Sequence, residues 1–187
     1  MFFRQKPTTT EDEWIAGCRK QEPKAQEKLY RQYYGYAMTI ALQYAGNEEE
    51  AVEILNDSFL KIFTKIATYD SNYPFKGWLR RIVVNTAIDY YRKAKKMGFQ
   101  ISIEDVKGEE TSTEMMDKLT AEDILKLLHQ LPEVQRMVFN LYEIEGYSHE
   151  EIAEQLGISE AVSRVYLSRA KQKLKVLVEK YFDKIIS

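Results

Sequence analysis

The sequence predicts an all-α protein built from two small helical domains that a flexible acidic linker joins. Apolar residues recur at three- and four-residue spacing along most of the chain, and no segment alternates apolar and polar residues as a strand would. Eight glycines and four prolines in 187 residues are few for an all-β chain, which needs many tight turns. Hydrophobic residues make up 44% of the chain and charged residues 30%, so the composition is globular and not disordered.

Three helices are predicted in the N-terminal domain, which we place at residues 1–97. Apolar and aromatic residues recur at helical spacing over residues 25–45, 48–66 and 75–96. A polar loop with a proline stop, residues 68–74, separates the second helix from the third. The N-terminal domain is therefore expected to hold three helices with short connections.

A linker is predicted at residues 98–118, which show no helical period and are rich in Glu, Ser and Thr. The C-terminal domain, residues 119–187, resumes with Thr120 as the N-cap of a helix. Pro132 breaks that helix and starts another, which we expect to end at Gly146. The chain thus has two helical domains and one tether.

A helix-turn-helix is predicted near the C-terminus. Ser148 and Glu151 form a capping-box pattern that opens a short helix, and Gly157 follows four residues after the small residue Ala153. Ser159 then caps a last helix that reaches about residue 181. A small residue where the helices cross, a glycine in the turn and apolar anchors on both helices are the features that this motif needs.

The last helix carries a polar and basic stripe that suits the major groove of DNA: Glu160, Arg164, Ser168, Lys171 and Lys175. Arg164, one turn into the helix, is expected to read a base edge, while the distal lysines meet the DNA backbone. Ser163 faces inward and is expected to bond to its own helix backbone. We expect His149, early in the preceding helix, to face solvent.

The charges are segregated along the chain although the net charge is only −2. Residues 47–57 carry five acids and no base, and residues 101–117 carry six acids against Lys107. Residues 76–96 carry seven bases against one acid, and residues 160–187 carry seven bases against three acids. Two basic helices separated by an acidic linker indicate a polyanion bound at two places.

Several kinds of chemistry find few residues to use. One cysteine, Cys18, excludes an internal disulfide and fits a reducing compartment. Two histidines, His129 and His149, leave little for a metal or catalytic cluster, so we expect no metal, no cofactor and no enzymatic activity. No apolar stretch has the length of a membrane span or a signal peptide, and we therefore expect a cytoplasmic protein without stable membrane insertion.

The sequence resembles the extracytoplasmic-function (ECF) sigma factors, a group of the sigma-70 family of bacterial RNA polymerase. The similarity runs from about Trp14 to Lys180 and rests on several blocks in the family's order. These blocks are residues 25–34, 53–61, 75–82 with Asn85 and 87–90, 131–132, 147–153 and 167–170. The resemblance implies a sigma domain two, promoter-melting helix included, followed by a sigma domain four.

The resemblance also implies roles for individual residues. Glu53, Asn56 and Asp57 would dock on core RNA polymerase, whose surface there would have to be complementary to an acidic helix. Promoter melting and contact with the downstream element would fall to Tyr69, Tyr73, Trp78, Arg80, Arg81, Asn85, Arg92 and Lys93, since aromatic platforms and cations capture single strands. The upstream element would lie against Ser159, Glu160, Arg164, Ser168, Arg169 and Lys171.

As a sigma factor, the protein would bind core polymerase and promoter DNA, direct initiation to specific promoters and help melt them. The resemblance adds an anti-sigma factor as a further potential partner, and we expect a monomer in the free state. A competing hypothesis is a conventional helix-turn-helix regulator whose N-terminal half senses a ligand or dimerises. The basic helix at residues 76–96 argues against it, because a sensor domain does not need that charge.

Overall fold

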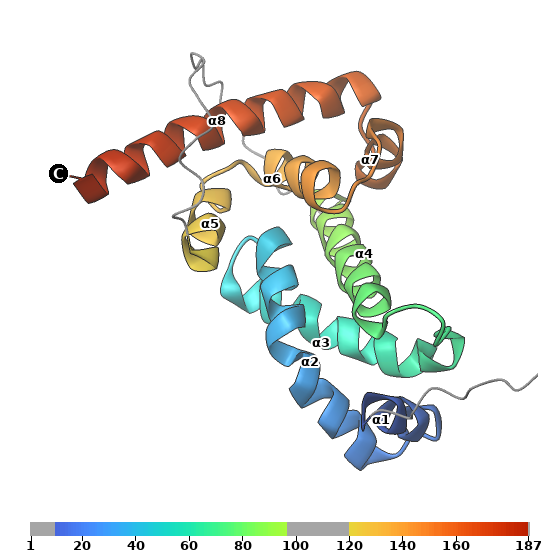
Figure 1. Ribbon diagram of the computed structural model, residues 1–187. Coiled ribbons are helices and arrows are strands. Elements are labelled where there is room, and N and C mark those ends of the chain that lie inside the picture. The colour runs from blue at the N-terminus through green and yellow to red at the C-terminus, as the bar shows by residue number, and fades with distance from the viewer. Residues whose placement is uncertain (1–9, 97–119, 187) are drawn as a thin grey trace, which may run out of the picture. The chain divides into compact units, whose positions relative to one another are not determined.

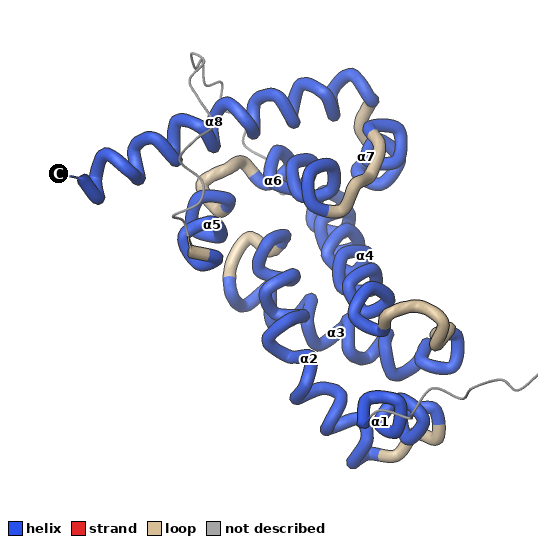
Figure 2. The backbone as a smooth tube through the Cα atoms, viewed as in Figure 1, coloured by secondary structure: helices blue, strands red, loops and turns tan. Residues whose placement is uncertain are grey.

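The structure is a computed structural model that describes residues 10–96 and 120–186 of the chain. Every regular element in these two ranges is helical (Figures 1 and 2). The elements are α1 (Thr10–Arg19), α2 (Pro23–Tyr44), α3 (Glu48–Lys65), the 3-10 turn η1 (Ile66–Thr68), α4 (Phe75–Lys96), α5 (Ala121–Leu128), α6 (Glu133–Phe139), the π-helical turn η3 (Asn140–Ile144), α7 (His149–Leu156) and α8 (Glu160–Ile186).

The all-α prediction is confirmed, and the three helices expected in the N-terminal part are α2, α3 and α4. No helix was predicted from the sequence at the position of α1, and one continuous helix was predicted where α6 passes into η3. The last helix, α8, runs to Ile186 and is longer than expected. The predicted linker, residues 98–118, lies outside the described residues.

The chain folds into two compact units. The first unit comprises residues up to Ala41 and Glu49–Thr86, and the second comprises Leu42–Glu48 and Ala87–Ser187. The second unit therefore contains the carboxyl ends of α2 and α4 together with α5 to α8. The predicted domain boundaries at residues 98 and 119 stay a prediction.

Aromatic side chains hold the first unit together. The ring of Phe75, at the start of α4, lies 5.1 Å from the ring of Tyr33 in α2 and 5.2 Å from the ring of Tyr69. Trp78 closes the cluster at 5.4 Å from Tyr69. Offset and edge-on ring contacts add to the burial of these large side chains, so the start of α4 is firmly placed on α2.

Close backbone packing brings α1 against the rest of the first unit. A Cβ built on Gly17 would lie 2.5 Å from the Cβ of Ala25, so α1 can approach α2 only with glycine there. Arg19 donates a hydrogen bond of 2.7 Å to the carbonyl of Tyr69, and Tyr33 bonds to Glu11. These contacts tie α1 to both α2 and the loop before α4.

In the second unit, α6 and α7 pack against α8, the long C-terminal helix of Figure 1. Leu128, Leu131 and Ala170 form a buried cluster that joins α5 to α8. Thr120 caps α5 as predicted, because its hydroxyl accepts from the amide of Asp123 and that carboxylate accepts from the amide of Thr120. The apolar stripe of α8 thus faces the neighbouring helices.

Candidate nucleic-acid interface

The predicted helix-turn-helix is present as α7, a short turn and α8. Ser148 and Glu151 form the reciprocal capping box, with bonds of 2.8 and 3.2 Å between each side chain and the other residue's amide. Gly157 has φ of 62°, in the left-handed region that an L side chain rarely adopts, and it ends α7. The Ser159 hydroxyl accepts from the amide of Val162 at 3.3 Å and so caps α8.

A histidine joins the two helices of this motif. His149 Nδ1 lies 2.9 Å from the Ser163 hydroxyl, and the His149 ring stacks on Tyr142 with ring centres 4.5 Å apart. The prediction that His149 faces solvent is therefore wrong, as is the prediction that Ser163 bonds to its own backbone. Burial, followed by the charge of Arg164, lowers the pKa of His149, so the neutral ring is favoured.

The outer face of α8 carries the predicted stripe. Glu160, Arg164, Ser168 and Lys171 are exposed, whereas Ser163 is buried. A carboxylate oxygen of Glu160 accepts from Arg164 at 2.6 Å, and Lys171 pairs with Glu143 at 2.7 Å. Lys175, the last residue of the stripe, is half-buried. Of the two other residues predicted to contact the upstream element, Ser159 is exposed and Arg169 is half-buried. The stripe is thus a charged surface on which Arg164 and Lys171 hold acidic partners in the free protein.

The loop before α4 holds two predicted base-contacting tyrosines in different environments. Tyr73 is 69% exposed, whereas Tyr69 is 7% exposed and packs on Phe75 and Trp78. The Tyr69 hydroxyl donates a bond of 2.6 Å to the carbonyl of Tyr73. Tyr69 and the half-buried Trp78 therefore belong to the core that supports the loop, and Tyr73 is the ring available at its tip.

Four cations and one amide line the surface of α4 outside that aromatic core. Arg81, Asn85 and Lys93 are exposed, and Arg80 and Arg92 are half-buried. Near the start of α4, the ammonium of Lys76 lies 4.6 Å from the centre of the Tyr36 ring. The helix thus offers a basic surface and a neighbouring exposed aromatic, as single-strand capture requires.

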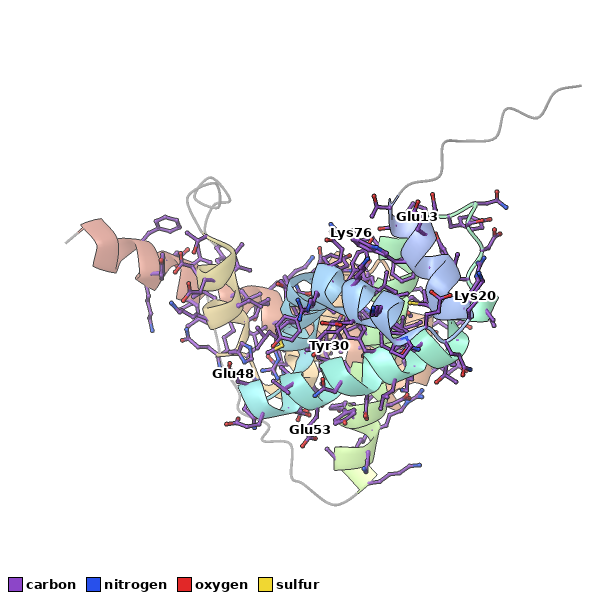
Figure 3. The ribbon with its side chains drawn as sticks, turned by 90° about the horizontal axis from the view of Figure 1, so that it is seen from below. Glu13, Lys20, Tyr30, Glu48, Glu53 and Lys76 are labelled. Atoms are coloured by element: carbon purple, nitrogen blue, oxygen red, sulfur yellow. The ribbon has the colours of Figure 1, made fainter. Side chains whose placement is uncertain are left out.

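A second charged surface lies on α3. Figure 3 shows Glu53 projecting away from the helices, and Asn56 is exposed while Asp57 is half-buried. The hydroxyl of Tyr30 on α2 donates to the Asn56 side chain at 3.4 Å. Leu60 shares this outer side of α3 and is 66% exposed. The acidic surface therefore contains an exposed apolar side chain, which the charge pattern did not indicate.

The described residues, 10–96 and 120–186, contain neither a metal-ligand cluster nor a membrane-spanning helix. No group of three or more His, Cys, Asp and Glu side chains there is placed to hold a metal ion. Nor does that part of the chain contain a helix long and apolar enough to cross a membrane.

Comparison with known proteins places both charged halves in one family. The family described as Sigma-70 region 2 matches residues 29–97, and Sigma-70, region 4 matches residues 121–174. RNA polymerase sigma factor YlaC of Bacillus subtilis is 30% identical over 158 residues, which cover 80% of this chain and 89% of YlaC. The chain belongs to the sigma-70 family of RNA polymerase sigma factors. It is therefore a transcription initiation factor and not an enzyme.

Further relatives of this sigma factor carry the ECF name. ECF RNA polymerase sigma factor SigM of Bacillus subtilis is 27% identical over 161 residues, covering 81% of this chain and 93% of SigM. ECF RNA polymerase sigma factor SigE of Mycolicibacterium smegmatis is 28% identical over 160 residues. That match covers 83% of this chain and 62% of SigE. The resemblance to ECF sigma factors is thus confirmed.

The two family matches coincide with the charged surfaces of the sigma factor. Region 2 contains the acidic surface of α3 and the basic surface of α4, and region 4 contains the helix-turn-helix. The competing hypothesis, a helix-turn-helix regulator whose N-terminal half senses a ligand or dimerises, is rejected because Sigma-70 region 2 occupies that half of the chain. The His149–Ser163 contact was not predicted from the sequence. Its one signal there was Ser163, a polar residue at an inward-facing position of its helix.

Proposed function

We propose that the chain binds core RNA polymerase through α3, holds the downstream promoter element with α4 and reads the upstream element with α8. The observation that carries this proposal is the presence of an acidic and a basic surface in region 2 and a helix-turn-helix in region 4 of one chain. The proposed division is residues 1–97 for domain two, 98–118 for the linker and 119–187 for domain four.

Polymerase docking is assigned to Glu53, Asn56 and Asp57 on α3. Exposed carboxylates attract a basic partner and orient its approach. Leu60, exposed beside them, adds an apolar contact that becomes buried when a partner covers α3. This combination of an apolar centre and charged surroundings is typical of a protein interface, and its partner is expected to be basic with an apolar pocket.

The docking assignment is tested by reversing two charges. Glu53→Lys with Asp57→Lys should abolish binding to core polymerase. Glu53 is exposed, and changes at such positions usually alter stability by less than ~0.5 kcal/mol, while an unfolding curve of the double variant checks that the half-buried Asp57 tolerates lysine. The matched control is Glu27→Lys, which reverses an exposed acid on α2 that pairs with Arg31 at 2.7 Å. Unchanged polymerase affinity in the double variant would refute the assignment.

Promoter opening is assigned to the exposed cations of α4 and to Tyr73. Cationic side chains that contact the DNA backbone hold the single strand, and an exposed aromatic ring stacks on an unpaired base. Arg81→Ala with Asn85→Ala should reduce transcription from duplex promoters more than from a template with a pre-melted bubble. An equal loss on both templates would contradict a role in opening: it would mean that these residues, together with Arg80, Arg92 and Lys93, only contact the DNA backbone.

The remaining assignments follow from those partners. Core polymerase and promoter DNA lie in the bacterial cytoplasm, so we propose that the protein acts there. We further propose that it is a monomer when free, and that an anti-sigma factor, where one exists, would compete with polymerase for the acidic surface of α3. Competition binding with labelled core polymerase tests the last point.

A further inference from the structure

We propose that the free protein contains an internal latch, in which domain four and the carboxyl ends of α2 and α4 cap one another's helices and keep one promoter-binding cation, Arg92, occupied. All the contacts lie inside the second unit, residues 42–48 and 87–187. The consequence for transcription rests on the proposed function, whereas the latch itself is a property of the free chain. The latch has two caps, one at each of two helix ends.

The first cap covers the carboxyl end of α2. His129 donates to the carbonyl of Leu42 at 2.9 Å, and Asn140 donates to the carbonyl of Gln43 at 2.7 Å. Arg136 donates to the next two carbonyls, those of Tyr44 and Ala45, at 3.2 and 2.9 Å. The last four carbonyls of a helix have no partner within it, and here side chains from beyond residue 119 supply one for the final three and for Ala45, the residue after α2.

The guanidinium of Arg136 suits this position electrostatically. The carboxyl end of a helix carries a partial negative charge, which a cation stabilises. Arg136 is only 3% exposed although it is charged, and Asn140 is fully buried. A buried arginine needs strong hydrogen bonds to offset its lost hydration, and the α2 carbonyls provide them. Sequence patterns alone would place both residues on a solvated face.

The second cap covers the carboxyl end of α7. Arg92 donates to the carbonyls of Gln155 and Glu154 at 2.5 and 3.3 Å and to the Gln155 side chain at 3.1 Å. Lys95 donates to the carbonyls of Leu156 and Gly157 at 3.1 and 3.2 Å. Two cations from the end of α4 thus neutralise the helix end that leads into the turn of the helix-turn-helix.

The second cap uses a residue that the proposed function needs elsewhere. Arg92 is assigned to the downstream promoter element, yet its Nε and Nη2 atoms already donate to α7. Of the three guanidinium nitrogens, only Nη1 makes no bond to α7, so a bidentate contact to phosphate through Nε and Nη2 requires the α7 bonds to break. Lys95 also covers the turn at Gly157, which positions the recognition helix α8. A promoter that takes the Nε edge of Arg92 therefore displaces these bonds, and the latched state competes with that contact.

The latch is built to open. Its two caps consist of hydrogen bonds, and two buried side-chain oxygens at the first cap, Gln43 Oε1 and Asn140 Oδ1, find no hydrogen-bond donor among the described residues. Unsatisfied buried polar atoms lower the stability of an interface, and water satisfies them when the interface separates. Polar interfaces within a chain separate more readily than apolar ones. Promoter DNA, by binding the open state more tightly than the latched state, would shift the population toward the open state.

The latch is tested in the free, full-length protein by measuring a distance between two spin labels. Lys96→Cys and Glu150→Cys place the labels at exposed positions on α4 and α7. The native Cys18 stays unlabelled, because its thiol is buried and burial raises its pKa to about 11. We expect one narrow distance distribution in the otherwise unchanged protein. A broad distribution there would overturn the proposal.

Two variants break one cap each. Arg136→Met, which keeps an unbranched apolar stem but removes the guanidinium, and Lys95→Gln should each broaden the distance distribution. Lys126→Met is the matched control, because it removes an exposed cation of α5 that pairs with Glu122 on its own helix at 2.9 Å, and it should leave the distribution narrow. Where Arg136→Met fails to fold, Lys95→Gln decides the outcome. A narrow distribution in a folded cap variant would overturn the latch.

The functional consequence has its own measurement. If the latched state holds about nine-tenths of the free protein, then Arg136→Met should bind promoter DNA about tenfold more tightly, since the apparent affinity scales with the competent fraction. Unchanged affinity together with a broadened distribution would overturn the claim that the latch inhibits. Failure of every variant and the wild type to bind polymerase would instead refute the proposed function and leave the distance result standing.

Discussion

The imidazole of His149 and the hydroxyl of Ser163 form a hydrogen bond of 2.9 Å across the helix-turn-helix. Ser163 is fully buried in the first turns of α8, and His149 is the first residue of α7. One face of the imidazole stacks on the ring of Tyr142, which fixes the plane of the imidazole. One side chain therefore ties together the two helices whose relative angle decides where the recognition residues point.

Removing this contact should weaken upstream-element binding. His149→Ala is expected to lower the free energy of unfolding by about 1 kcal/mol, the net value of a typical internal hydrogen bond. It should also reduce affinity for an upstream-element duplex. His149→Asn, whose amide nitrogen can take the place of Nδ1, should recover part of both losses. Thermal unfolding and duplex titration check this, and an alanine variant with wild-type affinity would speak against the contact.

Histidine protonation should make the fold sensitive to mild acid. Burial lowers the pKa values of both His129 and His149, and the charges of Arg136 and Arg164 lower them further. Each folded pKa thus lies below the unfolded value of about 6.5. The stability that each neutral histidine contributes to the folded state is complete above the unfolded pKa and is lost as pH falls through the folded pKa. Urea unfolding between pH 7.5 and 5 should show declining stability, with a smaller decline in His149→Asn.

The two glycines Gly157 and Gly35 should respond oppositely to alanine. Gly157→Ala forces a side chain into the left-handed region, so we expect a loss of about 1–2 kcal/mol. A Cβ on Gly35, inside α2, meets no atom within 4 Å. Gly35→Ala should therefore stabilise the protein by up to about 1 kcal/mol through helix propensity. Denaturant unfolding compares the two, and equal effects would contradict the assigned backbone roles.

Arg164 should read a base and not only a phosphate. Its guanidinium can pair bidentately with guanine, which is worth about 1–3 kcal/mol of discrimination. Arg164→Ala should relax the preference at one or two positions of the upstream element. Glu160→Gln, which releases the Arg164 ion pair, should retain that preference. Selection from a random duplex pool checks both. An unchanged motif with uniformly lower affinity for Arg164→Ala would make Arg164 a phosphate contact.

Local signals in the sequence predicted most of the fold. The capping residues Thr120, Ser148 and Ser159 act as expected, because a cap depends only on residues within one helical turn. Gly157 likewise adopts the positive φ that its position in the turn requires. The π-helical turn η3 escaped prediction, since apolar spacing alone does not distinguish it from a regular helix.

Contacts between distant segments could not be predicted from these patterns. Tyr69 lies in a polar loop and looked exposed, yet the rings of Phe75 and Trp78 bury it. Arg136 and Asn140 are polar residues whose burial depends on carbonyls almost a hundred positions away. Helical periodicity reports which face is apolar, but it carries no information about which partner covers a polar residue.

Transcription in vitro with purified core polymerase over a genomic library tests the central claim most directly. The account predicts that adding the chain to core polymerase yields transcripts from a limited set of start sites that share one upstream element. It also predicts that these transcripts disappear when Glu53→Lys and Asp57→Lys are combined. Transcripts at the same sites without the chain, or none in its presence, would contradict the assignment of promoter-specific initiation to this protein.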